Sequence, residues 1–567
     1  TLSCLRHPPP REGVVCVNQS NITLQELNDF SSLPWGRVPK AGEGIINKTE
    51  NEANMANKLL NDLNLDYLLV CCTNEFLVEY PALSENARYT LTGFSGSTGD
   101  ALITKDNIYL FVDGRYHTQA DNEVKDGVTV VKLKLGQKQD DEIRKLIEPQ
   151  KTLGIVAKKV YQARLETFKN YKIKLLDKDP INNFTEPHNS EFVQAIPPKE
   201  FKPEKPTFIT NLEEVSYLTG KRDFSKDCSS KIWAKLYIDK EQQVLLTDNC
   251  DKFLQNFEGE LAVDKSSINA FDYALIKNPV HKVSEIKLMK SVKTKDELEA
   301  YKKAFEHTDK AVMAIRDYIE SNDNLSEFDI AKRLREEFIK YGAKSLSFNS
   351  IVAINQNSAL AHYAKNAKDV ILEDGSLVLI DCGAYYESGL ATDITRVFVK
   401  GKPNELQREV YTTVLKAFLN AFKYTNEPRT RIRKAQQSFA NDCSLKGRGI
   451  PTGFEIDTLA HSILDNKIEG FTFGHGLGHG IGINVHEAPP NLSQNEIAKT
   501  EIVDGMTFTI EPGLYNPEHF GVRLENSCYM ECGKIHSFVK MGYEGKLINY
   551  DLLNEQEKEW LKDFKIL

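Results

Sequence analysis

Several features that mark specialised proteins are scarce or missing in this chain of 567 residues. It has only ten cysteines and no Cys-x-x-Cys pair, which excludes a disulfide-dense scaffold and a zinc site built from thiolate pairs. No apolar run approaches the roughly 20 residues that a membrane-spanning helix needs. The first residues also lack the basic, apolar and small-residue segments of a signal peptide. We therefore expect reduced thiols in a cytoplasmic protein that has no membrane partner.

An excess of positive charge is missing too. The chain has 72 lysines and arginines against 81 aspartates and glutamates, a formal net charge of −9. Proteins that bind nucleic acid usually present a basic surface, so no nucleic-acid partner is expected. Gly93, Gly96 and Gly99 do not have the spacing of a dinucleotide-binding or phosphate-binding loop. We interpret these glycines as tight turns.

The chain is too long for one hydrophobic core, because domains usually hold about 100–200 residues. A hydrophobic content of 41% is that of an ordinary globular protein. Four prolines between Ile196 and Pro206 indicate a linker. We predict a leader or disordered segment, an α/β domain, this linker, a shortened second α/β domain and a third domain, over residues 1–47, 48–195, 196–206, 207–292 and 293–567.

The first two domains alternate strand-like and helix-like segments, the pattern of α/β folds. We expect one helix, over residues 52–63. We expect six strands, over residues 67–72, 100–104, 108–112, 208–210, 234–238 and 243–246.

The third domain begins with a long amphipathic helix. Apolar residues from Leu298 to Ile319 are spaced by three and four residues, which places them on one helix face that packs into the core. Ser326 and Asp329 have the spacing of a capping box and predict a second helix that runs to Ile339.

Acidic residues lie in or beside the apolar strand-like segments that follow. Asp381 ends the apolar run Leu377–Ile380, and Asp393 shares a strand face with Thr395 because side chains alternate along a strand. Two further glutamates and a glycine-rich segment with histidines lie nearer the C-terminus. The candidate residues of this kind are Asp381, Asp393, Glu511, Glu525, His475, His479 and His486.

Each of these residues, taken alone, has an ordinary structural interpretation as a salt-bridge partner, a strand-end cap or a core histidine. If the four carboxylates converge, however, they repel one another in a medium that already penalises charge. Four carboxylates and one imidazole carry too much negative charge for one divalent ion and suit two ions that share bridging carboxylates. Oxygen-rich ligation with one nitrogen favours Mn²⁺, with Co²⁺, Fe²⁺ or Zn²⁺ as alternatives.

The order of these motifs resembles that of the pita-bread metallopeptidases, the family of methionine aminopeptidases, prolidases and Xaa-Pro aminopeptidases. The resemblance covers most of residues 295–567 and rests on Ser347–Val352, Asn357–Tyr363, Asp381–Gly383, Thr392–Arg396, His475–Gly482, Val485–Glu487, Ile510–Gly513 and Arg523–Glu525. Arg88–Gly99 with Asp113–Tyr116 is similar to the first domain of the three-domain form, aminopeptidase P. The implied fold is two N-terminal α/β creatinase-like domains followed by an α+β pita-bread catalytic domain.

The resemblance implies five metal ligands, Asp381, Asp393, His479, Glu511 and Glu525. In this family Asp393 and Glu525 would bridge two ions, Asp381 would hold one ion, and His479 and Glu511 would hold the other. A hydroxide activated by both ions would attack the scissile carbonyl carbon, and Glu511 would pass the proton. The resemblance further implies catalytic roles near the substrate for His362, His475 and His486, and supporting roles for Arg523 and Thr395.

The activity implied is that of a metal-dependent aminopeptidase that removes the N-terminal residue from peptides with proline in second position. The N-terminal domains would restrict access and help to pair two subunits into a homodimer. Two other hypotheses stay open. One is a prolidase-like dipeptidase for Xaa-Pro. The other is a non-catalytic peptide-binding pita-bread protein, against which the presence of all five ligand residues argues.

Overall fold

The structure is a computed structural model that describes residues 56–567 except 135, 186–187, 189–190, 364 and 425–449. The predicted leader over residues 1–47 lies outside the described residues. Of the helix expected over residues 52–63, the described part is helical over residues 56–62. Among the described residues, no helix combines the length and the apolar character needed to cross a lipid bilayer.

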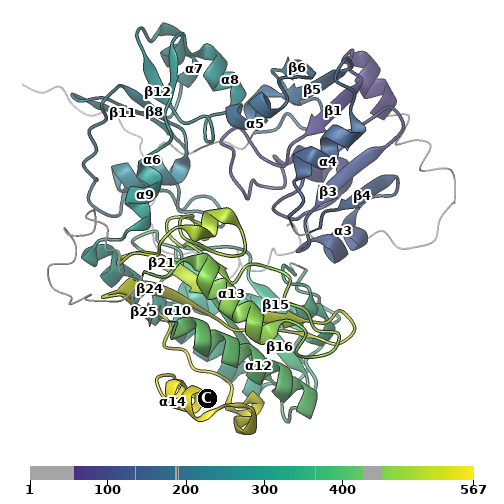
Figure 1. The fold of residues 1–567 in the computed structure, drawn as a ribbon, viewed down its shortest axis with the longest axis vertical. Coiled ribbons are helices and arrows are strands. Elements are labelled where there is room, and N and C mark those ends of the chain that lie inside the picture. The colour runs from purple at the N-terminus through teal and green to yellow at the C-terminus, as the bar shows by residue number, and fades with distance from the viewer. Residues whose placement is uncertain (1–55, 135, 186–187, 189–190, 364, 425–449) are drawn as a thin grey trace, which may run out of the picture. The chain divides into compact units, whose positions relative to one another are not determined.

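A six-stranded mixed sheet forms the centre of the N-terminal domain (Figure 1). In spatial order its strands are β4 (Val128–Lys132), β3 (Ile108–Val112), β2 (Ala101–Ile103), β1 (Tyr67–Val70), β5 (Thr152–Val156) and β6 (Lys172–Leu176). The accompanying helices are α2 (Ala87–Thr92), α3 (His117–Glu123), α4 (Gln139–Leu146), η2 (Ala157–Lys159) and α5 (Gln162–Thr167). The three strands expected here are confirmed as β1, β2 and β3. Alternate residues of β1 enter two separate apolar clusters, so both sheet faces are covered.

A five-stranded sheet follows. Its spatial order is β11 (Gln243–Leu246), β10 (Lys235–Ile238), β8 (Thr207–Ile209), β12 (Leu261–Val263) and β13 (Pro279–His281). The helices are α6 (Leu212–Thr219), α7 (Cys250–Asn256), α8 (Ala270–Leu275) and α9 (Ile286–Ser291), and β7 (Val193–Gln194) pairs with β9 (Lys221–Arg222). The three strands expected in this region are confirmed as β8, β10 and β11.

The C-terminal domain is built on an antiparallel sheet. Its strands are β15 (Ile351–Ile354), β16 (Leu377–Cys382), β18 (Ile394–Val399), β24 (Glu525–Glu531) and β21 (Thr507–Ile510), with β25 (Lys534–Ser537) paired to β24. Short two-stranded pairs join β14 (Ser345–Leu346) to β17 (Ala384–Tyr385), β19 (Gly478–His479) to β20 (Asn491–Leu492), and β22 (Gly513–Tyr515) to β23 (Gly521–Arg523).

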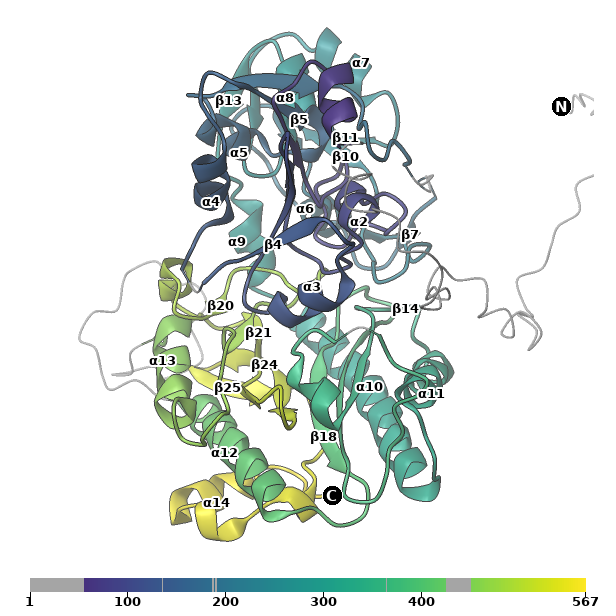
Figure 2. The ribbon, with the colours of Figure 1, turned by 90° about the vertical axis from the view of Figure 1, so that its right-hand side faces the viewer.

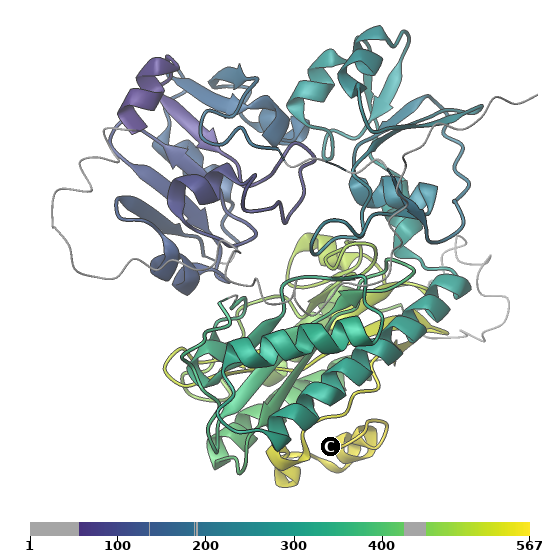
Figure 3. The ribbon, with the colours of Figure 1, turned by 180° about the vertical axis from the view of Figure 1, so that it is seen from behind.

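Long helices cover both faces of this sheet. Figure 2 shows α10 (Lys295–Ser321) and α11 (Glu327–Lys340) on one side of β18, and α12 (Glu405–Phe422) and α13 (Gly453–Leu464) on the other. Figure 3 shows α10 and α11 in front of the strands. The remaining helical segments are η3 (Asn355–Ala359), η5 (Glu496–Lys499), η6 (Gly545–Leu547), η7 (Tyr550–Leu552) and α14 (Glu555–Leu561).

The pleat of β16 explains this layered arrangement. Leu377 and Leu379 pack into the cluster of α12 and α13, whereas Val378 and Ile380 pack into the cluster of α10 and α11. Because successive side chains point to opposite faces, a strand covered on both sides has to be apolar throughout. The helix predicted from Leu298 is confirmed as α10, and the capping box at Ser326 does start α11.

Helix α2 was not among the predicted elements. Asn86 caps its first turn, and Gly93 ends it with a φ of 79°, so this glycine does lie at a turn. Six described cysteines are free, but Cys532 is disulfide-bonded. The expectation that every thiol is reduced is therefore wrong at that residue.

Arg396 on β18 ties the sheet to the C-terminal segment. Its side chain is 1% exposed. The guanidinium donates to the carbonyl oxygens of Glu525 at 2.6 Å, Met541 at 2.7 Å and Gly542 at 2.9 Å. Glu525 lies on β24, and Met541 and Gly542 are neighbours in the segment after β25, so one side chain of β18 ties together these two segments.

Replacing Arg396 with Met should lower the free energy of unfolding by about 3 kcal/mol, because several buried acceptors lose their donor at once. Urea unfolding followed by far-UV circular dichroism measures the change. Lys562→Ala, at an exposed position after α14, is the control and should leave the midpoint unchanged. An unchanged midpoint for Arg396→Met would contradict this account of the fold.

Candidate active site

The strand register brings four carboxylates to one end of the C-terminal sheet. Asp381 on β16 lies directly opposite Thr395 on β18, and Thr395 lies directly opposite Glu525 on β24. Residues opposite one another on neighbouring strands project from the same face. Asp393 precedes Thr395 by two residues, and Glu511 directly follows β21, the other neighbour of β24. All four carboxylates line one cavity of about 320 Å³.

His479 faces this carboxylate group from β19. Its Nδ1 lies 3.0 Å from the carbonyl oxygen of Gly480, so Nδ1 carries the hydrogen and Nε2 is left with a free lone pair. Nε2 lies 3.6 Å from Asp393 Oδ2 and 3.5 Å from Glu511 Oε1. One ligand atom each from Asp393, His479 and Glu525 lie within 4.8 Å of one another, the spacing that a shared cation requires.

The protein offers these four carboxylates too few positive charges and hydrogen-bond donors to offset their burial and mutual repulsion. Burial and the neighbouring carboxylates raise the pKa of Asp393 and of Glu511 well above their usual values. Burial, followed by Asp381, raises the pKa of Glu525 to about 8. Asp381 Oδ1, Asp393 Oδ1 and Glu525 Oε1 are buried without a hydrogen-bond partner. Unsatisfied carboxylate oxygens in such a place fit divalent cations that accept oxygen ligands.

Arg523 is the buried cation within this group. Its side chain is 3% exposed and donates to Asp381 Oδ2 at 2.5 Å. It also donates to Thr395 Oγ1 at 3.2 Å, and the Thr395 hydroxyl in turn donates to Glu525 Oε2 at 2.7 Å. Arg523 and Thr395 are therefore hydrogen-bonded to the carboxylates of Asp381 and Glu525, respectively.

His475 has protein partners on both ring nitrogens. Nδ1 lies 2.8 Å from the carbonyl oxygen of Gly476, and Nε2 lies 2.8 Å from the Tyr515 hydroxyl. The same hydroxyl accepts from Arg523 at 2.9 Å. Burial, then the charge of Arg523, lowers the pKa of His475 to about 3. The ring is thus held neutral at the end of a hydrogen-bonded row that starts at Arg523.

His486 and His362 also line this cavity. The ring of His486 is 4.5 Å from that of His479 in an edge-on arrangement. Its Nδ1 lies 3.2 Å from Glu79 Oε1. The ring of His362 lies 5.3 Å from that of Tyr116. The structure thus brings all eight acidic and histidine residues predicted from the sequence to one cavity.

Comparison with known proteins assigns the family. Residues 299–531 match the model of metallopeptidase family M24. Residues 54–183 match the creatinase/prolidase N-terminal domain. The chain therefore contains an M24 metallopeptidase domain and, before it, a creatinase/prolidase N-terminal domain. The family and the creatinase-like and pita-bread fold predicted from the motifs are confirmed. Divalent metal ions are accordingly its cofactors and peptides its substrates.

Relatives with known names match either most of the chain or a part of it. Xaa-Pro aminopeptidase 1 of Dictyostelium discoideum is 26% identical over 593 residues, which are 89% of this chain and 90% of that protein. Xaa-Pro dipeptidase of Pyrococcus furiosus is 37% identical over 242 residues, 43% of this chain and 61% of that protein. The crystal structure of X-prolyl aminopeptidase from Caenorhabditis elegans shares the fold with a TM-score of 0.75 at 19% identity, over 91% of this chain and 94% of that one.

The N-terminal domain supplies cavity residues that were not predicted from the sequence. Glu79, Tyr80 and Arg115 line the metallopeptidase cavity. The charge of His486 offsets the burial of Glu79 and lowers the pKa of that carboxyl to about 2. Arg115 belongs to the Asp113–Tyr116 turn. The arginine and tyrosine of that turn were the only feature of the sequence that could have indicated a cavity residue here. No local pattern marks Glu79 or Tyr80.

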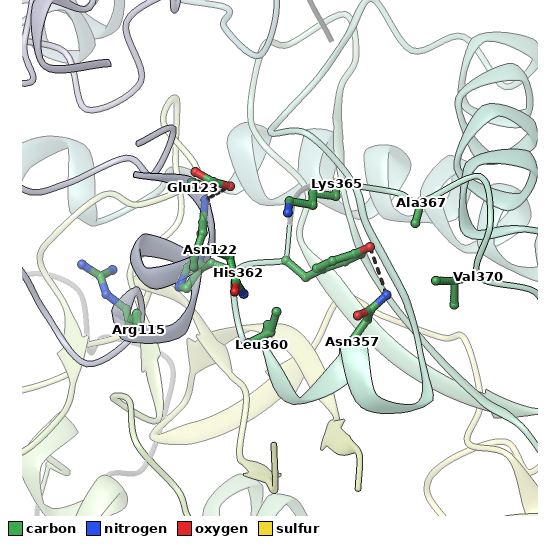
Figure 4. Close-up of a pocket in the computed structure, with 11 residues that line it drawn as sticks. Arg115, Asn122, Glu123, Asn357, Leu360, His362, Lys365, Ala367 and Val370 are labelled. Atoms are coloured by element: carbon green, nitrogen blue, oxygen red, sulfur yellow. Dashed lines mark hydrogen bonds between the residues drawn. The ribbon is translucent and has the colours of Figure 1, made fainter. Parts of the chain in front are cut away.

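A second cavity of about 230 Å³ adjoins the first and shares Arg115 and His362 with it. Figure 4 shows Asn122 and Glu123 of the N-terminal domain on one side and Lys365 of the catalytic domain on the other. The lining combines these amide and charged side chains with apolar ones such as Leu360 and Val370.

Proposed function

We propose that this metallopeptidase is an Xaa-Pro aminopeptidase, which releases the N-terminal residue from peptides with proline in second position. The observation that carries the proposal is the convergence of Asp381, Asp393, His479, Glu511 and Glu525 on one cavity. The names of relatives that align with about nine tenths of the chain support the proline preference. We further propose three domains over residues 48–195, 207–292 and 293–567, with the linker 196–206 between the first two.

Those five residues would hold two divalent ions, for which we propose Mn²⁺. Asp393 and Glu525 would be shared between the ions, Asp381 would bind one, and His479 and Glu511 would bind the other. The proximity of Asp393, His479 and Glu525 supports a shared site. When bound, the ions make water a nucleophile near neutral pH and polarise the scissile carbonyl.

The chain's own residues then handle protons and hold the substrate. Glu511, whose pKa is raised by burial and by Glu525, is suited to take a proton from the attacking water and pass it to the leaving nitrogen. His486 and His362, which line the cavity, act on the substrate. His475 holds the Tyr515 hydroxyl in place, and Arg523 and Thr395 keep Asp381 and Glu525 oriented.

The second cavity favours an aminopeptidase over a dipeptidase. A dipeptide ends at its proline, whereas a longer peptide needs room beyond it. The cavity next to His362 offers that room, and the Lys365 ammonium offers a partner for a peptide carboxylate. The dipeptidase relative aligns with only 43% of the chain. A non-catalytic peptide-binding role fits poorly with a complete ligand set.

We predict that Xaa-Pro-Yaa is cleaved with a kcat/KM at least about tenfold above that for Xaa-Ala-Yaa, on the order of 1.4 kcal/mol in transition-state binding. A bond to proline has no N–H, so a proline-specific site replaces that hydrogen bond with a pocket fitted to the ring. Mass spectrometry of matched tripeptides measures the release of free Xaa. Equal rates would indicate a broad aminopeptidase, and cleavage of Xaa-Pro dipeptides alone would establish the dipeptidase hypothesis.

We also propose that the protein is a cytoplasmic homodimer. Six free cysteines among the described residues favour a reducing compartment, whereas the disulfide at Cys532 is unusual there. Light scattering after size-exclusion chromatography tests the subunit number. Differential thiol labelling of protein lysed in an alkylating agent tests whether Cys532 is oxidised in the cell.

A further inference from the structure

A buried ionic cluster lies directly behind the candidate site. Glu487 follows His486, and its carboxylate Oε1 lies 3.2 Å from Lys293 Nζ and 3.3 Å from Lys290 Nζ. The three side chains are 2%, 4% and 6% exposed, respectively. Lys290 belongs to α9, and Lys293 lies two residues before α10. Contacts between charges that are shielded from water are strong and fix geometry.

The other oxygen of Glu487 is bonded to the loop over residues 480–487. Oε2 accepts from the backbone N–H of Ile483 at 2.9 Å and of Asn484 at 3.3 Å. A side chain at Gly482 would collide with this carboxylate, because its Cβ would lie 1.9 Å from Glu487 Oε1. The loop therefore folds around the carboxylate of its last residue, Glu487. Lys290 and Lys293 anchor that carboxylate to α9 and to the segment before α10.

The same loop carries the ring of His486 and touches His479. The backbone N–H of Glu487 donates to the Gly480 carbonyl at 2.8 Å, and His479 Nδ1 lies 3.0 Å from that oxygen. The Asn484 side chain donates to the His486 carbonyl at 3.0 Å and accepts from Lys231 at 2.9 Å. The backbone at His486 and at the residue after it is thus held by hydrogen bonds that depend on the conformation of the loop.

We propose that Glu487, anchored by Lys290 and Lys293, is a positioning residue that sets the orientation of His486 toward the substrate. It touches no part of the cavity itself, since the residues that line the cavity include His486 but not Glu487. The inference rests on the proposed function, in which His486 acts on the substrate. Misplacing a reacting group by about 1 Å can cost on the order of a hundredfold in rate.

The test measures kcat, KM and metal content of the metal-loaded full chain on Xaa-Pro-Yaa. Glu487→Gln keeps the shape and removes the charge that holds both lysines. We expect kcat/KM to fall at least about tenfold, through kcat, with wild-type metal content. Because the lysines are left without a partner, the pair Glu487→Gln with Lys293→Met is measured as well. This double variant removes one of the two lysine charges that Glu487→Gln leaves without a partner. Its kcat/KM should be as low as that of Glu487→Gln alone.

The decisive comparison places Glu487→Gln in a His486→Ala background. If Glu487 acts through His486, the added change should alter kcat/KM less than about twofold. Glu337→Gln is the matched control, because this carboxylate on α11 is also 2% exposed and paired with Arg333 and Lys340. It should keep wild-type kcat/KM.

Three outcomes would overturn the inference. One is wild-type kcat/KM in the Glu487→Gln, Lys293→Met pair. Another is an equal loss in the wild-type and His486→Ala backgrounds, which would make the role of Glu487 merely structural. Both leave the proposed function untouched. Wild-type turnover of His486→Ala alone would instead overturn the role of His486, and this inference with it.

Discussion

Asp393→Asn should lose metal and at least about a hundredfold in turnover, as expected when a group central to electrostatic catalysis is removed. The substitution keeps the shape of the side chain and removes a negative charge. Asp393 Oδ1 is buried without a hydrogen-bond partner, and Oδ2 lies 3.6 Å from His479 Nε2. An amide in this place offers one weaker ligand atom in place of two carboxylate oxygens.

Metal content per chain, measured by inductively coupled plasma mass spectrometry alongside activity, checks this result. Asp309→Asn is the matched control. Asp309 is a half-buried aspartate outside the cavity, and its carboxylate accepts from the Lys540 N–H at 2.8 Å. Full metal occupancy together with normal turnover in Asp393→Asn would remove Asp393 from the metal site.

The histidines of the cavity should divide into two groups. His479→Ala should lose metal, because its Nε2 is the nitrogen that faces Asp393 and Glu511. His486→Ala and His362→Ala should keep metal and turn over slowly, by about a hundredfold for a group that positions or protonates the substrate. The Glu79 carboxylate occupies Nδ1 of His486, which leaves Nε2 to act on the substrate.

Metal analysis and steady-state kinetics on the same preparations separate these two roles. His536→Ala, whose ring stacks on Tyr529 outside the cavity, is the control and should match the wild type in both measurements. If His486→Ala loses the metal while His479→Ala keeps it, the roles assigned to these two histidines are reversed.

Much of the fold follows from local chemistry. The spacing of apolar residues in α10 and the cap at Ser326 act within one or two helical turns. The apolar run before Asp381 predicts a strand covered on both faces, and β16 is such a strand. Asp393, which we expected on a strand, lies one residue before β18. These features depend on residues that are close to one another in the sequence, so they can be predicted from it.

The rest depends on contacts between distant segments. Asp381, Thr395 and Glu525 form one row across three strands. Thr395 and Glu525 lie 130 residues apart in the chain, so no local sequence pattern records their pairing. Glu79 meets His486 across 407 positions in the chain. The short helix α2 depends on the Asn86 cap, which the glycine pattern of the following segment obscured.

The central claim is that two divalent ions held by these five residues cleave an Xaa-Pro bond. The most direct measurement removes metal with a chelator, adds Mn²⁺ stepwise to the dialysed enzyme, and follows the release of Xaa from Xaa-Pro-Yaa. We predict no turnover without metal and a rise that levels off at two Mn²⁺ per chain, with Asp393→Asn failing to recover. Full activity of the metal-free protein, or a plateau without any Xaa-Pro cleavage, would contradict the account.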